Sequence, residues 1–161
     1  VADARAAGPD HDWRLDLAVL EPPADATADE AEDFLPEPPL VIGDEARLRQ
    51  VIVNLLANAR VHTPAGSHVT TTLARERDTL IVRIHDDGPG IAPDVRDRLF
   101  ERFARGDSSR ERRTGSTGLG MSIALAIVQS HGGSIDVDSS TAPEDHGTTF
   151  TVRLPAAAVE E

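Results

Sequence analysis

The chain has 161 residues, a formal net charge of −12 and no cysteine. The length fits one domain with its own core, and the acidic balance disfavours general binding to nucleic acid or anionic membranes, which need a basic face. The missing cysteines exclude disulfides and thiolate metal sites, and no apolar run approaches the roughly 20 residues of a membrane span, so we expect this stretch to be soluble.

The first predicted element is an Ala-rich helical segment over residues 1–8, ended by Gly8 and Pro9. Apolar residues alternate with charged ones over 13–17, which predicts a strand. Residues 21–40 contain seven acidic residues, no basic residue and five of the 11 prolines. This composition predicts a loop or disordered insert that holds seven of the twelve net negative charges.

The pattern from residue 44 onward predicts a mixture of helices and strands without a regular alternation. Asp44 is the expected N-cap of a helix, and apolar residues at three- and four-residue steps form one stripe along it. The predicted elements are a helix over 44–61, strands over 68–76 and 79–85, a short helix over 94–103, an apolar helix over 119–130, and strands over 134–137 and 148–154. We expect an α/β (α+β) two-layer sandwich, with about five mainly antiparallel strands covered on one face by about three helices.

The only two asparagines of the chain, Asn54 and Asn58, are four residues apart on the 44–61 helix. At about 3.6 residues per turn they lie on one face. Uncharged amide oxygens suit a hydrated Mg²⁺ that also binds the phosphates of a nucleotide. Alone, such a pair is more often a solvated helix face, but its position beside the apolar stripe favours a site.

An acidic turn rich in glycine, residues 86–91, follows the 79–85 strand directly. Gly88 and Gly90 permit sharp turns and close approach of a flat ligand. A carboxylate at a strand end can accept a hydrogen bond from an amino group such as that of adenine. A tight turn without function has the same composition, so this motif by itself is moderate evidence.

A Gly-rich stretch, residues 114–121, opens the apolar helix over 119–130. Free amides and the helix dipole at such a start form an anion site. The spacing is neither the dinucleotide fingerprint nor a Walker loop, which needs a Lys that this chain lacks. Residues 105–113 before it carry a net charge of +2, and Arg side chains suit phosphate oxygens.

The order of these motifs resembles the catalytic, ATP-binding domain of bacterial sensor histidine kinases, in the superfamily of gyrase, heat-shock chaperone and mismatch-repair ATPases. Residues 44–59 resemble its N box, 86–91 its G1 box, 99–103 its F box and 115–120 its G2 box. The resemblance covers about residues 40–155 and implies the Bergerat-type ATP-binding fold, with ATP and Mg²⁺ as cofactors.

The resemblance also implies roles for single residues. Asn58 would bind Mg²⁺, Asn54 would lie near the phosphates, and Asp86 would accept from the adenine amino group. Phe100 and Phe103 would anchor the lid rather than touch ATP. The catalytic residues so implied are Asn54, Asn58, Arg105 and Arg110. The ATP-binding residues are Asn54, Asn58, Arg60, His62, Asp86, Gly88, Gly90, Ile91, Gly115, Ser116, Thr117, Gly118, Leu119 and Gly120.

Two departures from the family pattern concern basic and phosphoaccepting residues. Many members have a basic residue and then Tyr after the Asn-Ala pair, whereas this chain has Arg60, Val61 and His62, so either Arg60 or His62 takes that place. No histidine of the chain lies in the phosphoacceptor motif, so the chain alone should bind ATP without phosphorylating itself.

The expected organisation is the tail of a preceding helix over 1–10, one catalytic domain over 11–158 and a short tail over 159–161, with an acidic loop at 21–40 and an ATP lid at 99–117. The resemblance implies a cytoplasmic, monomeric fragment of a dimeric, membrane-anchored sensor. Its partners would be a dimerisation domain that carries the phosphoacceptor His, and a response regulator.

Three other functions remain open at this point: an ATPase of the same superfamily, a serine kinase of the anti-sigma type, and a nucleotide-sensing module without catalysis. The ATPases have a Glu one turn before the metal-binding Asn, where this chain has Asn54. Since a hydrolase needs a base there, the kinase is favoured.

Overall fold

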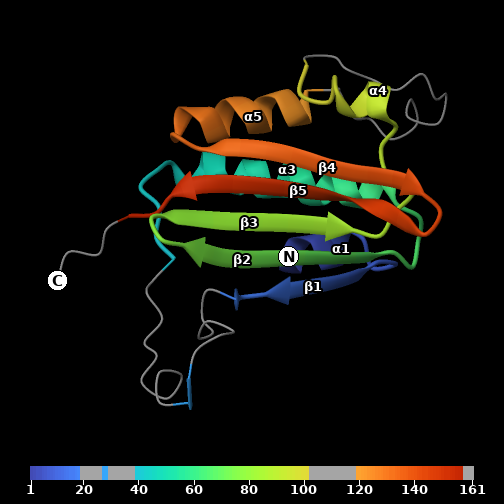
Figure 1. Ribbon diagram of the computed structural model, residues 1–161, viewed down its shortest axis with the longest axis horizontal. Helices are drawn as coiled ribbons and strands as arrows, with labels where there is room; N and C mark the ends of the chain where they lie inside the picture. The colour runs from blue at the N-terminus through green and yellow to red at the C-terminus, as the bar shows by residue number, and fades with distance from the viewer. Residues whose placement is uncertain (19–26, 29–38, 102–118, 158–161) are drawn as a thin grey trace.

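The computed structural model describes residues 1–18, 27–28, 39–101 and 119–157 (Figure 1). Most of the predicted acidic loop over 21–40 and most of the predicted lid over 99–117 lie outside these ranges. No helix of the described ranges combines the length and the apolar character that a membrane crossing requires.

One five-stranded sheet forms the centre of the fold, in the order β1-β2-β3-β5-β4. Strand β1 pairs with β2 in parallel, and the other neighbours are antiparallel. The strands are β1 (Asp12–Asp16), β2 (His68–Glu76), β3 (Thr79–Asp86), β4 (Ser134–Ala142) and β5 (Asp145–Pro155). The expected number of strands and the mainly antiparallel pairing are confirmed.

Helices cover one face of this sheet, and Figure 1 shows α1 and α3 behind the strands. The described helices are α1 (Ala2–Ala7), α3 (Glu45–His62), α4 (Pro93–Arg96) and α5 (Gly120–Ser130). Leu55 of α3, Val128 of α5 and Phe150 of β5 are fully buried together in the core. Val1 and Ala4 pack against this core, so α1 is joined to the domain.

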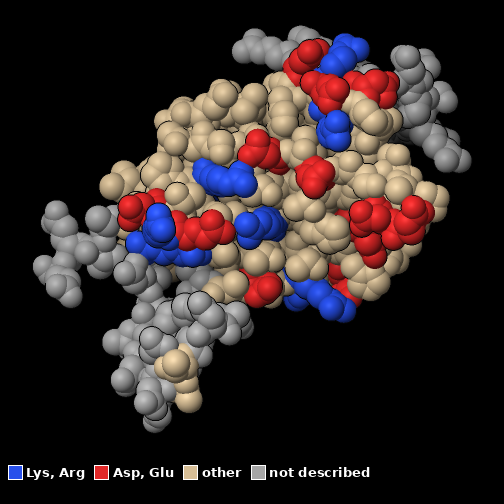
Figure 2. Space-filling view, in the orientation of Figure 1, with Lys and Arg blue, Asp and Glu red and all other residues tan. Residues whose placement is uncertain are grey.

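The two faces of the sheet differ as the alternation of strand side chains requires. Ile84 and Val152 point into the core, whereas the opposite face has a row of threonines and charged side chains. Figure 2 shows acidic and basic side chains interspersed over this exposed face. The expected two-layer sandwich is therefore confirmed.

Two polar contacts fix the start of α3. The Asp44 carboxylate accepts a hydrogen bond from the Arg47 backbone N–H at 3.0 Å, which confirms the predicted N-cap. The Asp44 N–H donates to His131 Nε2 at 3.0 Å, and His131 Nδ1 donates to the Ile127 carbonyl at 2.7 Å. These partners require a neutral imidazole with its proton on Nδ1, which ties the end of α5 to the start of α3.

The prediction of a helix over 94–103 was wrong in extent. Helix α4 has four residues, with Pro93 in its first turn. The chain then continues in i→i+3 hydrogen bonds, from Leu99 N–H to the Arg96 carbonyl and from Glu101 N–H to the Arg98 carbonyl. Such tight turns do not propagate far. The last two strands, in contrast, are longer than predicted, because residues 134–142 and 145–155 form one continuous hairpin.

Candidate nucleotide-binding site

The candidate site lies at the end of the sheet where β3 terminates. The register places Asp86 of β3 between Val69 of β2 and Thr148 of β5. Helix α3 reaches the same end with His62, its last residue. Side chains from the middle and the end of the sequence therefore meet here.

Asp86 is a buried carboxyl group, with 4% of its surface exposed. Its Oδ1 accepts a hydrogen bond from the Gly88 backbone N–H at 3.0 Å. Burial raises the pKa of Asp86 above its ordinary value, because the charged form loses hydration; the Gly88 N–H and the nearby His85 and His62 oppose this rise, while Asp87 adds to it. A carboxylate in this setting gains from a further hydrogen-bond donor, such as a ligand amino group.

Gly88 and Gly90 have a packing reason to be glycine. A Cβ on Gly88 would lie 2.4 Å from Thr63 Cγ2, and a Cβ on Gly90 would lie 1.9 Å from the Ser140 carbonyl oxygen. Gly90 also has a φ of 77°, in the left-handed region that favours glycine. These two close contacts are made to Thr63, the C-cap residue of α3, and to β4, while the approach of a flat ligand to the turn stays a prediction.

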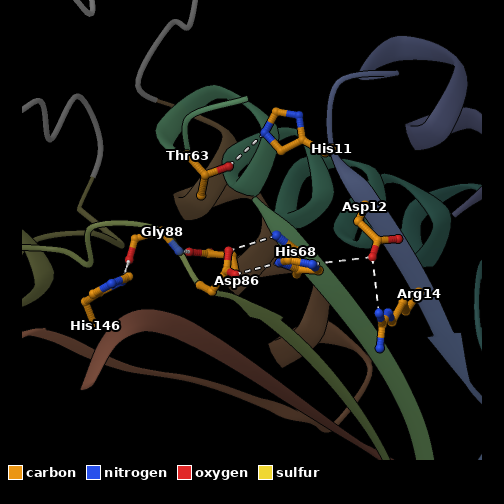
Figure 3. A network of polar contacts seen from close by, with 9 residues as sticks. His11, Asp12, Arg14, Thr63, His68, Asp86, Gly88 and His146 are labelled. Atoms are coloured by element: carbon orange, nitrogen blue, oxygen red, sulfur yellow. Dashed lines mark hydrogen bonds and ion pairs between the residues drawn. The ribbon is translucent and has the colours of Figure 1, made fainter. Parts of the chain in front are cut away.

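The second carboxylate of the turn, Asp87, contacts His68, the first residue of β2; Figure 3 shows His68 beside the turn that contains Asp86 and Gly88. Asp87 accepts from the His68 backbone N–H at 2.8 Å and contacts His68 Nδ1 at 2.8 Å. On the other side of the turn, His146 Nδ1 donates to the Gly88 carbonyl at 2.8 Å. Asp86 and Asp87 are consecutive in the chain but have different environments, and the inward one faces the core.

The asparagine row on α3 ends at the site. Asn54, Asn58 and His62 follow one another at steps of four residues, so they lie along one side of the helix. Asn54 Nδ2 donates to the Gly120 carbonyl at 3.1 Å, which joins α3 to the start of α5. Within the described ranges, the half-buried Asn58 side chain makes no hydrogen bond and is available to a ligand.

Arg60 and His62, the two alternatives for the basic residue, are separated by the geometry of α3. The Arg60 side chain lies over Gly8, since a Cβ on Gly8 would come within 2.9 Å of Arg60 Cδ. His62 lies near enough to Asp86 to oppose the rise in the pKa of that carboxyl group. The structure thus brings His62, and not Arg60, to the Asp86 end of the asparagine row.

Other predicted residues are divided between the described ranges and the rest. The Ile91 N–H donates to Ser139 Oγ at 2.8 Å, and Ile91, Leu99 and Phe100 pack against the core. Leu119 is half-buried just before α5. The residues that lie outside the described ranges are Phe103, Arg105, Arg110, Gly115, Ser116, Thr117 and Gly118.

The fit to a magnesium ion rests on the kind of donor present. No group of three His, Asp or Glu side chains in the described ranges comes together to hold a metal. A single amide oxygen at Asn58 suits an ion whose remaining ligands are phosphate oxygens and water, which is the usual state of Mg²⁺ with a nucleotide. The donor set therefore fits a metal that enters with its nucleotide.

Sequence reasoning missed three polar residues around the turn. Thr148 is 4% exposed, pairs with Asp86 across the sheet and contacts Ser139 Oγ at 2.9 Å. His68 and His146 hold the turn from two sides. A histidine near the start of a strand carries no signal for such a contact, because the partner is 19 or more residues away.

Comparison with known proteins identifies the family of the chain. Residues 43–158 match the family described as histidine kinase-, DNA gyrase B- and HSP90-like ATPase. The chain is 48% identical over 155 residues to the probable sensor histidine kinase TcrY of Mycobacterium tuberculosis, covering 96% of this chain and 28% of TcrY. It is 42% identical over 117 residues to the sensor histidine kinase RppB of Synechocystis, covering 73% of this chain and 25% of RppB.

Solved structures give the same result. The mycobacterial sensor histidine kinase MprB superposes with a TM-score of 0.76 at 29% identity, covering 98% of this chain and 91% of that one. Full-length ShkA in complex with AMPPNP superposes with a TM-score of 0.69 at 25% identity, covering 97% of this chain and 29% of ShkA. The chain spans about a quarter of the length of TcrY and RppB. It belongs to the family of histidine kinase-, DNA gyrase B- and HSP90-like ATPases, as an ATP-binding catalytic domain of the sensor histidine kinase type.

Proposed function

We propose that this domain binds Mg²⁺-ATP at the Asp86 end of the sheet and supplies its γ-phosphoryl group to a histidine on a separate dimerisation domain. The phosphoryl group then passes to a response regulator. The observation that carries the proposal is the buried Asp86 carboxyl group beside an asparagine row whose Asn58 amide is available. ShkA, which superposes on this chain, was solved in complex with AMPPNP, and this supports a nucleotide-binding role for the domain.

In the proposed complex, Asp86 accepts a hydrogen bond from the amino group of adenine, and Asn58 holds Mg²⁺. The metal supplies charge neutralisation on the phosphates. Phosphoryl transfer depends mainly on positioning and electrostatic stabilisation, so a domain that orients ATP needs no nucleophile of its own. Leu119 and Gly120, together with residues 115–118, would direct backbone amides to the phosphates, and Arg105 and Arg110 remain predicted phosphate contacts.

The structure favours a kinase over a hydrolase at one residue. Asn54 occupies the position of the ATPase Glu, and its amide nitrogen donates to the Gly120 carbonyl at 3.1 Å. An amide is not a base, and this one links two helices. Rapid ATP hydrolysis by the purified chain without a histidine partner would contradict the proposal and support the ATPase.

The proposal is tested by calorimetric titration with a non-hydrolysable ATP analogue, with and without Mg²⁺. We expect binding that depends on Mg²⁺ in the natural chain. Asn58→Ala should weaken it at least tenfold in Mg²⁺ and should remove most of the Mg²⁺ dependence. The matched control is Gln129→Ala, which changes an exposed side chain on α5.

Phosphoryl transfer is tested by adding a dimerisation domain from the same kinase together with labelled ATP. Acid-labile, alkali-stable label on that domain is the expected result. Tight nucleotide binding without any transfer would instead support the nucleotide-sensing module.

A further inference from the structure

Asp87 and His68 are joined more closely than a surface ion pair requires. His68 donates from its backbone N–H to Asp87 Oδ1 at 2.8 Å and contacts Asp87 Oδ2 through Nδ1 at 2.8 Å. The Asp87 N–H also donates to the His68 carbonyl at 3.3 Å. Because a carboxylate only accepts, the proton between the two side chains lies on Nδ1.

The Nε2 edge of the His68 ring lies toward Asp12 of β1. Its Nε2 lies 3.6 Å from Asp12 Oδ2, and the same carboxylate oxygen lies 3.3 Å from Arg14 NH2. Figure 3 shows His68 between Asp12 of β1 and the turn after β3. The hydrogen bond from Nδ1 orients the ring toward Asp87 at 2.8 Å, and the ring can fix the Asp87 carboxylate in turn.

The turn is fixed at a second point. His146 Nδ1 donates to the Gly88 carbonyl at 2.8 Å, and the Gly88 N–H donates to Asp86 Oδ1 at 3.0 Å. Asp87 lies between Asp86 and Gly88, so rotation of the Asp87 backbone would redirect both neighbours. We call the two hydrogen bonds from the His68 backbone N–H and Nδ1 to the Asp87 carboxylate the clasp. The clasp opposes that rotation.

We propose that His68 is a positioning residue of the nucleotide site, which acts through Asp87 to keep the Asp86 carboxylate directed toward the adenine amino group. This rests on the proposed function of Asp86. In this proposal the His68 ring makes no contact with the nucleotide. It restricts the motion of the turn after β3, and that turn carries Asp86, which does contact the nucleotide. Preorganisation of this kind improves the hydrogen bond to the base and leaves the contacts to the phosphates unchanged.

The test compares His68→Asn with His68→Leu. The amide nitrogen of Asn stands at the same number of bonds from Cα as Nδ1 of His, so it can donate to Asp87, whereas Leu cannot. The readout is the ratio of affinities for ATP and for purine riboside triphosphate, which lacks the adenine amino group, in the presence of Mg²⁺. We expect His68→Leu to lower this ratio about tenfold, and His68→Asn to keep it within about twofold.

A double variant separates action through Asp87 from a general loss of stability. His68→Leu combined with Asp87→Ala should lower the ratio no further than either single change, because both remove the same clasp. The control is Arg83→Leu, which breaks an exposed ion pair with Glu76 between the same two strands (3.6 Å) and should leave the ratio unchanged. Where His68→Leu does not fold, His68→Ala, which also lacks a donor, takes its place in the comparison.

Two results would overturn the inference. One is that His68→Leu keeps the same ratio of affinities for ATP and purine riboside triphosphate as the natural protein. The other is that His68→Leu loses affinity equally for both nucleotides, which would indicate a structural role only. If the natural chain binds both nucleotides equally, the assignment of Asp86 to the base fails first, and the positioning role falls with it.

Discussion

Asp86 is a residue where binding and stability make opposite demands. Its carboxyl group is buried with the Gly88 N–H as its hydrogen-bond donor, and burial raises its pKa. A buried carboxylate that lacks donors destabilises the empty domain, whereas a ligand N–H supplies what it lacks. In the proposed complex the base supplies this donor, so we infer that this end of the sheet is less stable without nucleotide than it could be.

Asp86→Asn tests that inference. The amide keeps the shape but carries no buried charge, so we expect the melting temperature of the nucleotide-free protein to rise near pH 7, by about 2–4 °C for each kcal/mol gained. Affinity for ATP should fall about 10- to 100-fold, as for a lost hydrogen bond to a charged group. Thermal denaturation and calorimetric titration measure the two effects, and a variant that loses both affinity and stability would contradict the account.

The natural protein should also bind ATP less tightly in mild acid. In the proposed complex the ionised form of Asp86 accepts from the base, so binding would favour ionisation, and affinity should decline as pH falls through the raised pKa of this group. In Asp86→Asn this part of the pH dependence should be absent. Titrations over a series of buffers down to about pH 5 provide the check.

Asp87 has the opposite linkage. Burial would raise its pKa, but the hydrogen bonds from the His68 N–H and ring outweigh this and lower it below the ordinary value of 3.8. Its stabilising effect is therefore present above that value and is lost as pH falls through the folded-state pKa. We expect Asp87→Asn to show a smaller decline of melting temperature than the natural protein below about pH 4. Parallel curves for the two proteins would show that the clasp does not act through this charge.

Helix α3 is the element that the sequence predicted best. Its apolar stripe, its Asp44 cap and its asparagine pair are all local patterns, and the helix over 45–62 agrees with them. The contact that Asn54 makes could not be predicted, because Gly120 follows it by 66 residues. Helix α4 shows the reverse case, since charged residues over 94–101 suit a helix while the chain forms tight turns instead.

Asn54→Ala tests the link between α3 and α5. We expect loss of the hydrogen bond to the Gly120 carbonyl to destabilise the start of α5 by about 1 kcal/mol. Hydrogen exchange at residues 121–124 of the nucleotide-free protein should accelerate several-fold. Gln50→Ala, one turn earlier on the same helix, is the control, and equal exchange in the two variants would contradict the assigned link.

At the scale of the whole molecule, topology assembles the site. The parallel pairing of β1 with β2 places Asp12 beside His68, and the antiparallel pairings place Val69, Asp86 and Thr148 in one row. The sequence predicted the strands and the fold class, because alternation and motif order are visible in it. It could not predict this row, since pairing partners far apart in the chain leave no local pattern.

Charge is also distributed unevenly on this scale. The net charge of −12 disfavours a surface that binds polyanions in general, and seven of the negative charges belong to residues 21–40. Five of the six histidines, in contrast, lie beside elements that converge on the Asp86 end: His11, His62, His68, His85 and His146.

The most direct measurement is an amide NMR titration of the chain with a non-hydrolysable ATP analogue in Mg²⁺. The account predicts saturable one-to-one binding, with the largest shift changes at residues 54–62 and 86–91, small changes near His131 at the opposite end of the sheet, and loss of binding when the metal is chelated. Absence of saturable binding, or shift changes centred on the His131 end, would contradict it.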